Sequence, residues 1–159
     1  MSIAILCPVV AILLVVADQL IKQWAVGALA EGSIPLIEGV LSFTYHENFG
    51  AAFGLMQNMQ PFLIGATVLI MLGVFVLICM GRIKGWLLTA SVTLIVAGGI
   101  GNLIDRVVNG YVIDYIYFEL IDFPIFNFAD CCVVVGTGLM ILYALIDDRK
   151  PKKEKEQES

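Results

Sequence analysis

The sequence predicts an all-α integral membrane protein with four transmembrane helices, a small extracytoplasmic β-platform and a short interfacial helix. The 159 residues are 60% hydrophobic and only 14% charged, whereas soluble domains are roughly 45–50% apolar and about 25% charged. Four apolar stretches reach the length of about 20 residues that a helix needs to cross the hydrocarbon core. Basic residues gather outside these stretches, as is typical of multi-pass proteins.

The predicted spans cover residues 3–24, 61–80, 86–104 and 128–146. The first stretch lacks a basic leader and a small-residue cleavage site, so we expect it to be retained as a helix. No repeat of about 20–50 residues and no low-complexity linker divides the chain. We therefore expect one membrane-embedded domain over residues 1–159, ending in a solvated, disordered tail at 147–159.

The basic residues predict the orientation in the membrane. Seven of the nine Lys and Arg residues lie in the tight turn 81–85 or in the tail, and such an excess is typical of cytoplasmic segments. The N-terminus is expected on the same side because the number of spans is even. The loops at about 25–60 and 105–127 are then outside the cytoplasm.

The first outer loop has a local pattern of its own. Residues 40–46 alternate apolar Leu41, Phe43 and Tyr45 with polar side chains, and a period of two predicts a strand. Residues 51–56 are predicted to form the short helix in the membrane interface. The loop is therefore expected to be an amphipathic platform rather than a plain linker.

Charge and cysteine usage argue against several functions. The net charge of -5 and the lack of a basic cluster argue against nucleic-acid binding. The four cysteines have no metal-ligand spacing with the single histidine, His46, so we expect no metal site. Residues 98–101 include three glycines, but they lie within a predicted span, where glycine favours close helix contact over phosphate binding.

Polar and ionisable residues concentrate in the outer half of the predicted spans and in the outer loops. Such groups are costly inside or beside hydrocarbon and indicate function by default. They are Asp18, Lys22, Asn48, Asn102, Asp105, Arg106, Asp114, Asn127 and Asp130. We expect these side chains to converge on one site.

Asp114 and Asp130 are the candidates for acid–base chemistry. Asp114 has aromatic and β-branched neighbours in the third loop, an unusual setting for a solvated carboxylate. Asp130 begins the fourth span, where a helix-capping or first-turn role is an equally good interpretation. Two carboxylates in apolar surroundings share a proton, because both cannot ionise cheaply. Such a pair suits amide hydrolysis, with the roles of base and acid left unassigned between its members.

The other polar residues have structural interpretations beside the functional ones. Asp18 and Lys22 are spaced i,i+4 in the order that favours an ion pair, and their depth also allows a supporting role. Asn48 lies among small residues that let the backbone approach a ligand. Arg106 either snorkels to the interface, pairs with Asp105 or holds substrate carbonyls. His46 is interpreted as a polar loop residue.

A small polytopic transporter or proton-relay protein is the alternative function. Such proteins carry polar residues along the depth of a pathway. Here these residues lie on the outer side and the second span is almost wholly apolar, which favours a hydrolase.

Five motifs follow one another along the chain. They are Asp18-Gln19 with Lys22, Asn48-Phe49-Gly50-Ala51-Ala52-Phe53-Gly54, Gly101-Asn102-Leu103-Ile104-Asp105-Arg106, Val112-Ile113-Asp114-Tyr115 and Phe123-Pro124-Ile125-Phe126-Asn127-Phe128-Ala129-Asp130. Together with the four spans, their order resembles the lipoprotein signal peptidases, also called signal peptidase II. The resemblance covers nearly the whole chain. It departs from the family at Tyr115, where phenylalanine is common, and at Cys131-Cys132, where small residues such as serine are usual.

The resemblance implies an aspartyl endopeptidase of the bacterial cytoplasmic membrane that cleaves prolipoproteins just before a diacylglyceryl-modified cysteine, near the outer face. It assigns the catalytic dyad to Asp114 and Asp130. The residues implied around the dyad are Asn48, Asn102, Arg106 and Asn127 for substrate binding, with Asp18, Lys22, Gly50 and Asp105 in support. No cofactor is implied. The resemblance also implies membrane lipid as a partner and the cyclic peptide globomycin as an inhibitor. Separately, we expect residues 31–56 to act as a lid.

Overall fold

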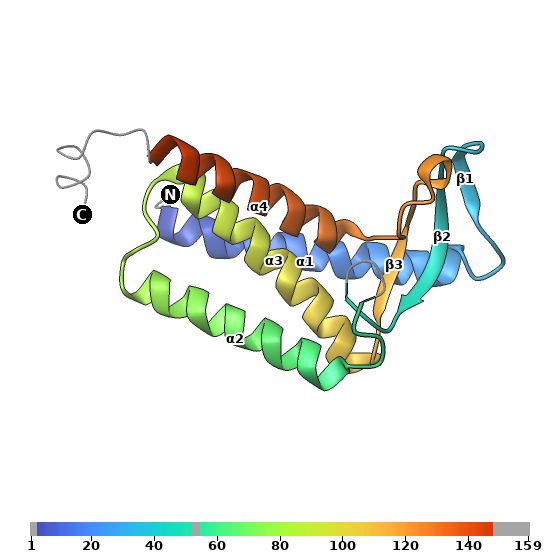
Figure 1. The fold of residues 1–159 in the computed structure, drawn as a ribbon, viewed down its shortest axis with the longest axis horizontal. Helices are drawn as coiled ribbons and strands as arrows, with labels where there is room; N and C mark the ends of the chain where they lie inside the picture. Colours follow the sequence, from blue (N-terminus) through green and yellow to red (C-terminus); the bar gives the residue numbers. More distant parts are fainter. Residues whose placement is uncertain (1–2, 52–54, 148–159) are drawn as a thin grey trace.

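The computed structural model describes residues 3–51 and 55–147 (Figure 1). Its four long helices are α1 (Ile3–Ala28), α2 (Gln60–Cys79), α3 (Trp86–Val108) and α4 (Phe128–Asp147). All four are long and apolar enough to cross a membrane, and together with a small sheet they confirm the predicted fold class. The prediction ended the first and third spans too early, because α1 and α3 continue through their polar ends. The tail 148–159 and Gly54 lie outside the described residues.

α3 is the central helix and packs against α1, α2 and α4 (Figure 1). Glycine permits the close approach of α4, since a Cβ on Gly98 of α3 would overlap the Ala129 carbonyl oxygen of α4. A Cβ on Gly101 would lie 2.5 Å from the Asp18 carboxylate of α1. Glycines in the third span therefore serve helix contact, as predicted.

A three-stranded antiparallel sheet lies across one end of the bundle (Figure 1). Its strands are β1 (Ile34–Ile37), β2 (Leu41–Asn48) and β3 (Val112–Tyr117), in the order β1-β2-β3. β2 confirms the strand predicted in the first outer loop. Asp114 lies in the predicted third outer loop, but within a strand, β3, that the sequence pattern did not predict. Residues 112–115 are all buried, so β3 has none of the polar alternation that marks a half-exposed strand.

An aromatic cluster fixes the sheet to α1. Phe43 of β2 meets Trp24 of α1 edge-on, with ring centroids 5.4 Å apart. Phe43 also contacts Tyr115 of β3, and Tyr115 packs in a core with Ala25 and Leu29. The extension of α1 beyond its predicted end thus holds the strand that carries Asp114.

The short helix predicted over residues 51–56 is absent from the described part of that segment. Residues 55–58 form turns, and Met56 has a φ of 55°, which a right-handed helix does not allow. The Ala51 N–H donates to the Leu55 carbonyl oxygen at 2.7 Å and closes the loop instead. Between β3 and α4, η2 (Glu119–Ile121) is a short 3-10 turn in the third loop.

The lid predicted over residues 31–56 stays a prediction, and it includes β2. β2 is hydrogen-bonded to β3 with Ser42 opposite Tyr117 and Asn48 opposite Val112. Much of the segment is therefore joined to the third loop by strand pairing, and a movement of the whole segment would have to break that ladder.

Candidate active site

Asp114 projects from β3 and is buried. Its Oδ2 accepts a hydrogen bond from Asn48 Nδ2 at 2.9 Å, and its Oδ1 accepts one from Asn127 Nδ2 at 2.6 Å. The Gly50 N–H donates to Asn48 Oδ1 at 2.9 Å, so the amide of Asn48 is oriented with its NH2 group toward the carboxylate. The pairing of β2 with β3 therefore brings Asn48, one of the two donors, to Asp114.

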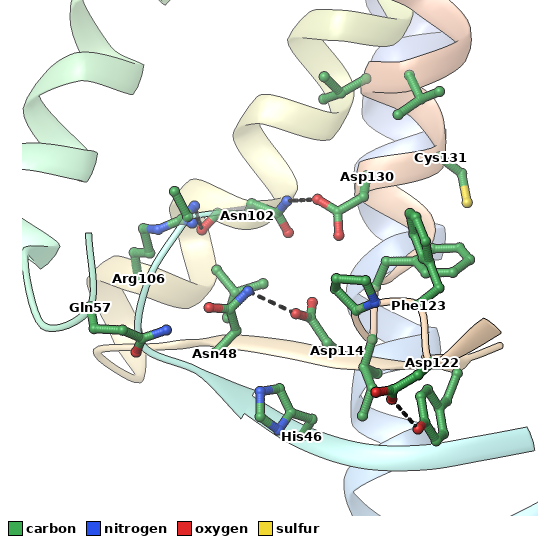
Figure 2. Close-up of a pocket in the computed structure, with 18 of the residues that line it drawn as sticks. His46, Asn48, Gln57, Asn102, Arg106, Asp114, Asp122, Phe123, Asp130 and Cys131 are labelled. Atoms are coloured by element: carbon green, nitrogen blue, oxygen red, sulfur yellow. Dashed lines mark hydrogen bonds between the residues drawn. The ribbon is translucent and has the colours of Figure 1, made fainter. Parts of the chain in front are cut away.

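Asp130 lies in the first turn of α4, and Asn127 caps that helix. The Asp130 N–H donates to Asn127 Oδ1 at 2.9 Å, while the Asn127 N–H donates to Asp130 Oδ2 at 3.1 Å. This reciprocal pattern is a capping box. Asp130 Oδ1 remains for the site and accepts from Asn102 Nδ2 of α3 at 2.8 Å (Figure 2). The capping interpretation of Asp130 is thus confirmed, and the catalytic interpretation stays a prediction.

The buried Asn127 side chain connects the Asp114 carboxylate to the backbone of Asp130. Its Nδ2 donates to Asp114 while its Oδ1 accepts from the Asp130 N–H. The same Nδ2 lies 3.1 Å from Asn102 Oδ1. Figure 2 shows the Asp114 and Asp130 carboxylates one above the other, beside Asn48 and Asn102. Residues far apart in sequence therefore meet in one network, as predicted.

The surroundings of Asp114 favour its protonated form. Burial raises the pKa of Asp114 from 3.8 to about 7, and the negative charge of Asp130 acts in the same direction. The hydrogen bonds from Asn48 and Asn127 favour the carboxylate and oppose the rise in pKa. Near neutral pH the two aspartates can hold one proton between them.

A cavity of about 810 Å³ opens onto both aspartates. Its volume is that of a typical site for an organic ligand. The lining is polar near Asn102, Arg106, Asp114 and Asp130. It is mostly apolar along residues 123–126 of the third loop and 133–135 of α4. The carboxylates therefore stand beside a largely apolar space.

Arg106 of α3 reaches the same cavity. Its Nη2 donates to the Gly50 carbonyl oxygen at 3.1 Å, and its Nε is buried without a partner among the described residues. A Cβ on Gly50 would lie 2.5 Å from the Leu55 carbonyl oxygen, so glycine is needed there. Arg106 does not pair with Asp105, which forms an ion pair with Lys22 at 2.8 Å.

The supporting residues form a buried group beside the network. Lys22 Nζ lies 2.9 Å from Asp18 Oδ2, which confirms the predicted i,i+4 ion pair. It also donates to Asn102 Oδ1 at 2.9 Å. Asp18, Lys22 and Asp105 are each 1% exposed, so this group makes its contacts without solvent.

Three residues near the site were missed or misjudged. Gln19 Nε2 donates to Asp105 Oδ1 at 3.0 Å and lies 3.3 Å from Asp18 Oδ2. The first motif included Gln19, but no role was predicted for it. His46 was interpreted as a loop residue, but it lies in β2 opposite Asp114 and lines the cavity. Gln57 also lines the cavity, and no sequence pattern marked it.

The fold and the site define a class of protein, a polytopic membrane enzyme. A bacterial membrane enzyme solved by the in meso method at 2.3 Å has a TM-score of 0.84 and 30% identity, covering 92% of this chain and 92% of that one. The signal peptidase II family model, described as "Signal peptidase (SPase) II", matches residues 10–146.

Two relatives named lipoprotein signal peptidase extend this match. The one from Brevibacillus brevis is 38% identical, covering 89% of this chain and 95% of the relative. The one from Clostridium tetani is 39% identical, covering 88% and 92%. The chain belongs to the signal peptidase II family. It is therefore a multi-pass bacterial membrane protease, and the transporter alternative is not favoured.

Proposed function

We propose that the chain is an aspartyl endopeptidase with Asp114 and Asp130 as its catalytic dyad. The observation that carries this proposal is the pair of carboxylates on separate elements, both bound to Asn127 beside one cavity. The raised pKa of Asp114 supports it, because a dyad needs one proton shared by two carboxylates.

The proposed reaction uses the two protonation states of the dyad. The charged carboxylate takes a proton from water while the water oxygen attacks the carbonyl carbon of the scissile amide. The protonated carboxyl donates to the carbonyl oxygen and stabilises the tetrahedral intermediate. A proton then passes to the amide nitrogen, the C–N bond breaks, and a carboxylic acid and an amine leave. The proton belongs to the pair, so neither aspartate is fixed as base or acid.

The residues around the dyad have separate proposed roles. Asn48, Asn102 and Asn127 donate to the carboxylates and hold them in place. Arg106 brings an N–H fork into the cavity, with its Nε still to be paired. We assign it to substrate carbonyls, because preorganised donors stabilise developing negative charge.

The proposed substrates are prolipoproteins with a diacylglyceryl-modified cysteine, cut just before that cysteine. The apolar lining formed by Phe123, Val134 and Val135 suits acyl chains or an apolar signal peptide. Each buried CH2 group contributes about 0.8 kcal/mol, so the lipid would hold the cysteine beside the carboxylates. By the family resemblance, globomycin is proposed as an inhibitor.

The proposed orientation has both termini in the cytoplasm and the site near the outer face of the bacterial cytoplasmic membrane. Arg82 and Lys84 lie in the turn between α2 and α3, at the end of the bundle away from the sheet (Figure 1). Basic segments favour the cytoplasmic side, which supports a site on the outer side.

The test is cleavage by the purified protein of one prolipoprotein in two forms, with and without the diacylglyceryl group. We expect a cut before the cysteine in the modified form alone, blocked by globomycin. Equal cleavage of both forms would refute lipid recognition. Cleavage by a preparation in which both aspartates are replaced by asparagine would refute the dyad.

A further inference from the structure

Asp18, Lys22 and Asp105 do not line the cavity, yet they form a densely bonded ionic group behind it. Lys22 Nζ contacts Asp18 Oδ2, Asp105 Oδ2 and Asn102 Oδ1 at 2.9, 2.8 and 2.9 Å. An ammonium group has three donors, so these contacts use all of them. The three side chains are buried and do not line the cavity, so we infer their role from the groups that they contact.

Asp18 holds the start of α4. Its Oδ1 accepts a hydrogen bond from the Ala129 N–H at 3.0 Å. Ala129 directly precedes Asp130, and an N–H in the first turn of a helix has no partner within the helix. The neighbouring Phe128 N–H donates to the Tyr115 hydroxyl at 3.2 Å. The backbone just before Asp130 is thus fixed to α1 and β3.

Asp105 makes the equivalent contact to the strand. Its Oδ2 accepts a hydrogen bond from the Ile113 N–H at 3.1 Å, and Ile113 directly precedes Asp114. Two buried carboxylates therefore each bind the backbone N–H of the residue before a dyad aspartate. Lys22 bonds to both carboxylates, so one side chain connects the two backbone anchors.

Lys22 also sets the orientation of Asn102. The Asn102 Oδ1 accepts from Lys22, which turns its Nδ2 toward Asp130 Oδ1 at 2.8 Å. If the amide of Asn102 were reversed, its NH2 group would face the ammonium of Lys22. Its carbonyl oxygen would then face the carboxylate of Asp130. The ammonium, together with Asn127 Nδ2 at 3.1 Å from the same oxygen, therefore decides which end of Asn102 meets the dyad.

We propose that Asp18, Lys22 and Asp105 are positioning residues that set the separation of Asp114 and Asp130 and the orientation of Asn102. This inference rests on the proposed dyad. A misplacement of about 1 Å can cost about a hundredfold in rate, so a rigid link between the anchors has a direct catalytic effect. Buried ion pairs often add little stability compared with apolar replacements, which agrees with a geometric role.

The first test compares an acceptor-retaining with an acceptor-removing substitution at each anchor. Asp18→Asn and Asp105→Asn keep an oxygen that can accept from the backbone N–H, whereas Asp18→Ala and Asp105→Ala do not. We expect kcat to fall about tenfold in the asparagine variants and about a hundredfold in the alanine variants. KM for the lipid-modified substrate should change less than threefold, because the group does not line the cavity.

Lys22→Met removes the common link while keeping an unbranched chain of similar length. We expect kcat to fall about a hundredfold with KM nearly unchanged. If this variant does not fold, the two asparagine variants still decide the proposal, because they keep the shape of both anchors.

Ser91→Ala is the matched control for loss of a buried polar contact. Ser91 Oγ donates to the Gly136 carbonyl oxygen of α4 at 2.8 Å, away from the cavity. It should lower the melting temperature without changing kcat. The proposal is overturned if the anchor variants lower kcat no more than Ser91→Ala, or if asparagine and alanine variants lose equal activity. Should Asp114→Asn and Asp130→Asn stay active, the dyad fails instead, which is a separate outcome.

Discussion

The two ends of the helix bundle bury different chemistry. The sheet end, covered by β1, β2 and β3, buries a polar group that comprises Asp18, Lys22, Asp105, Asp114 and Asn127. Toward the turn end, at the connection between α2 and α3, Ser91 is the buried polar residue among those described. Both ends belong to the same helices, so the difference lies in the kind of side chain that each end buries.

The turn end needs only close packing, for which apolar side chains and glycine suffice. At the sheet end each buried carboxylate has to find donors, because an unpaired charge in hydrocarbon costs several kcal/mol. Asp18 and Asp105 meet that need with Lys22 and backbone N–H groups, whereas Asp114 and Asp130 are bound by neutral asparagine amides. The first two carboxylates therefore have a cationic partner, whereas the second two accept their hydrogen bonds from neutral donors.

The largest effect is expected from substitution at the dyad. Asp114→Asn or Asp130→Asn should lower cleavage of the lipid-modified substrate by about a thousandfold or more, because general acid–base catalysis alone contributes about 10²–10⁴-fold. Abundance in the membrane should be unchanged. The assay is turnover by purified protein, with quantitative blotting for abundance.

Asp122→Asn is the control for those two variants. Asp122 lines the same cavity, but its carboxylate accepts from the exposed Tyr117 hydroxyl at 2.7 Å and not from an asparagine. This variant should keep most of the activity. If it loses as much as the dyad variants, any carboxylate in the cavity would matter and the dyad would not be distinguished.

Arg106 should give the next largest effect. Arg106→Gln removes the charge and most of the N–H fork, so kcat/KM should fall about a hundredfold, the effect of losing one preorganised donor. Arg106→Lys keeps the charge without the planar fork and should recover only part of the activity. The measurement is the initial rate over a range of substrate concentrations. Full activity in the glutamine variant would contradict the proposed role of Arg106 in binding substrate carbonyls.

Much of the sheet end was predictable from residue chemistry, but its geometry was not. Charged and amide side chains in apolar surroundings identified the members of the site. The sequence pattern missed β3, because its buried residues do not alternate, and therefore missed the pairing that puts His46 opposite Asp114. The capping box of Asn127 and Asp130 follows a visible spacing, but only the fold brings Asn127 to Asp114.

The turn end was predicted more completely. Its helices follow from the length of each apolar stretch. At this end α2 ends at Cys79, α3 begins at Trp86 and α4 ends at Asp147, each within one residue of the predicted 80, 86 and 146. Packing of apolar helices tolerates many side chains, so the pattern alone was sufficient. Hydrogen bonds at the sheet end join residues that are far apart in the sequence. The hydrophobic periodicity of one segment does not predict where such residues meet.

The pH dependence of cleavage should follow the protonation of Asp114. Burial raises the pKa of Asp114 to about 7, so its protonated form is lost as the pH rises through that value. A reaction that needs one proton on the dyad should then slow by up to about tenfold for each pH unit above 7. At low pH the second carboxylate also takes a proton, and activity should fall again.

This profile is measured as kcat/KM for the lipid-modified substrate between pH 4 and pH 9, at constant detergent and salt. Circular dichroism at each pH serves as the check on folding. A rate that stays constant from pH 6 to pH 9 would contradict a shared proton.

The smallest effect is expected at the turn end. Ser91→Ala removes the hydrogen bond to the Gly136 carbonyl oxygen, and hydrogen bonds between helices in membranes contribute about 1 kcal/mol. The variant should unfold at a melting temperature a few degrees lower, with the pH profile and kcat of the parent. A change in kcat would mean that packing of α3 on α4 near Ser91 reaches Asn102 and Asp130. The two ends of the bundle would then be coupled rather than separable. Ser91 and Asn102 both lie on α3, and Gly136 and Asp130 both lie on α4.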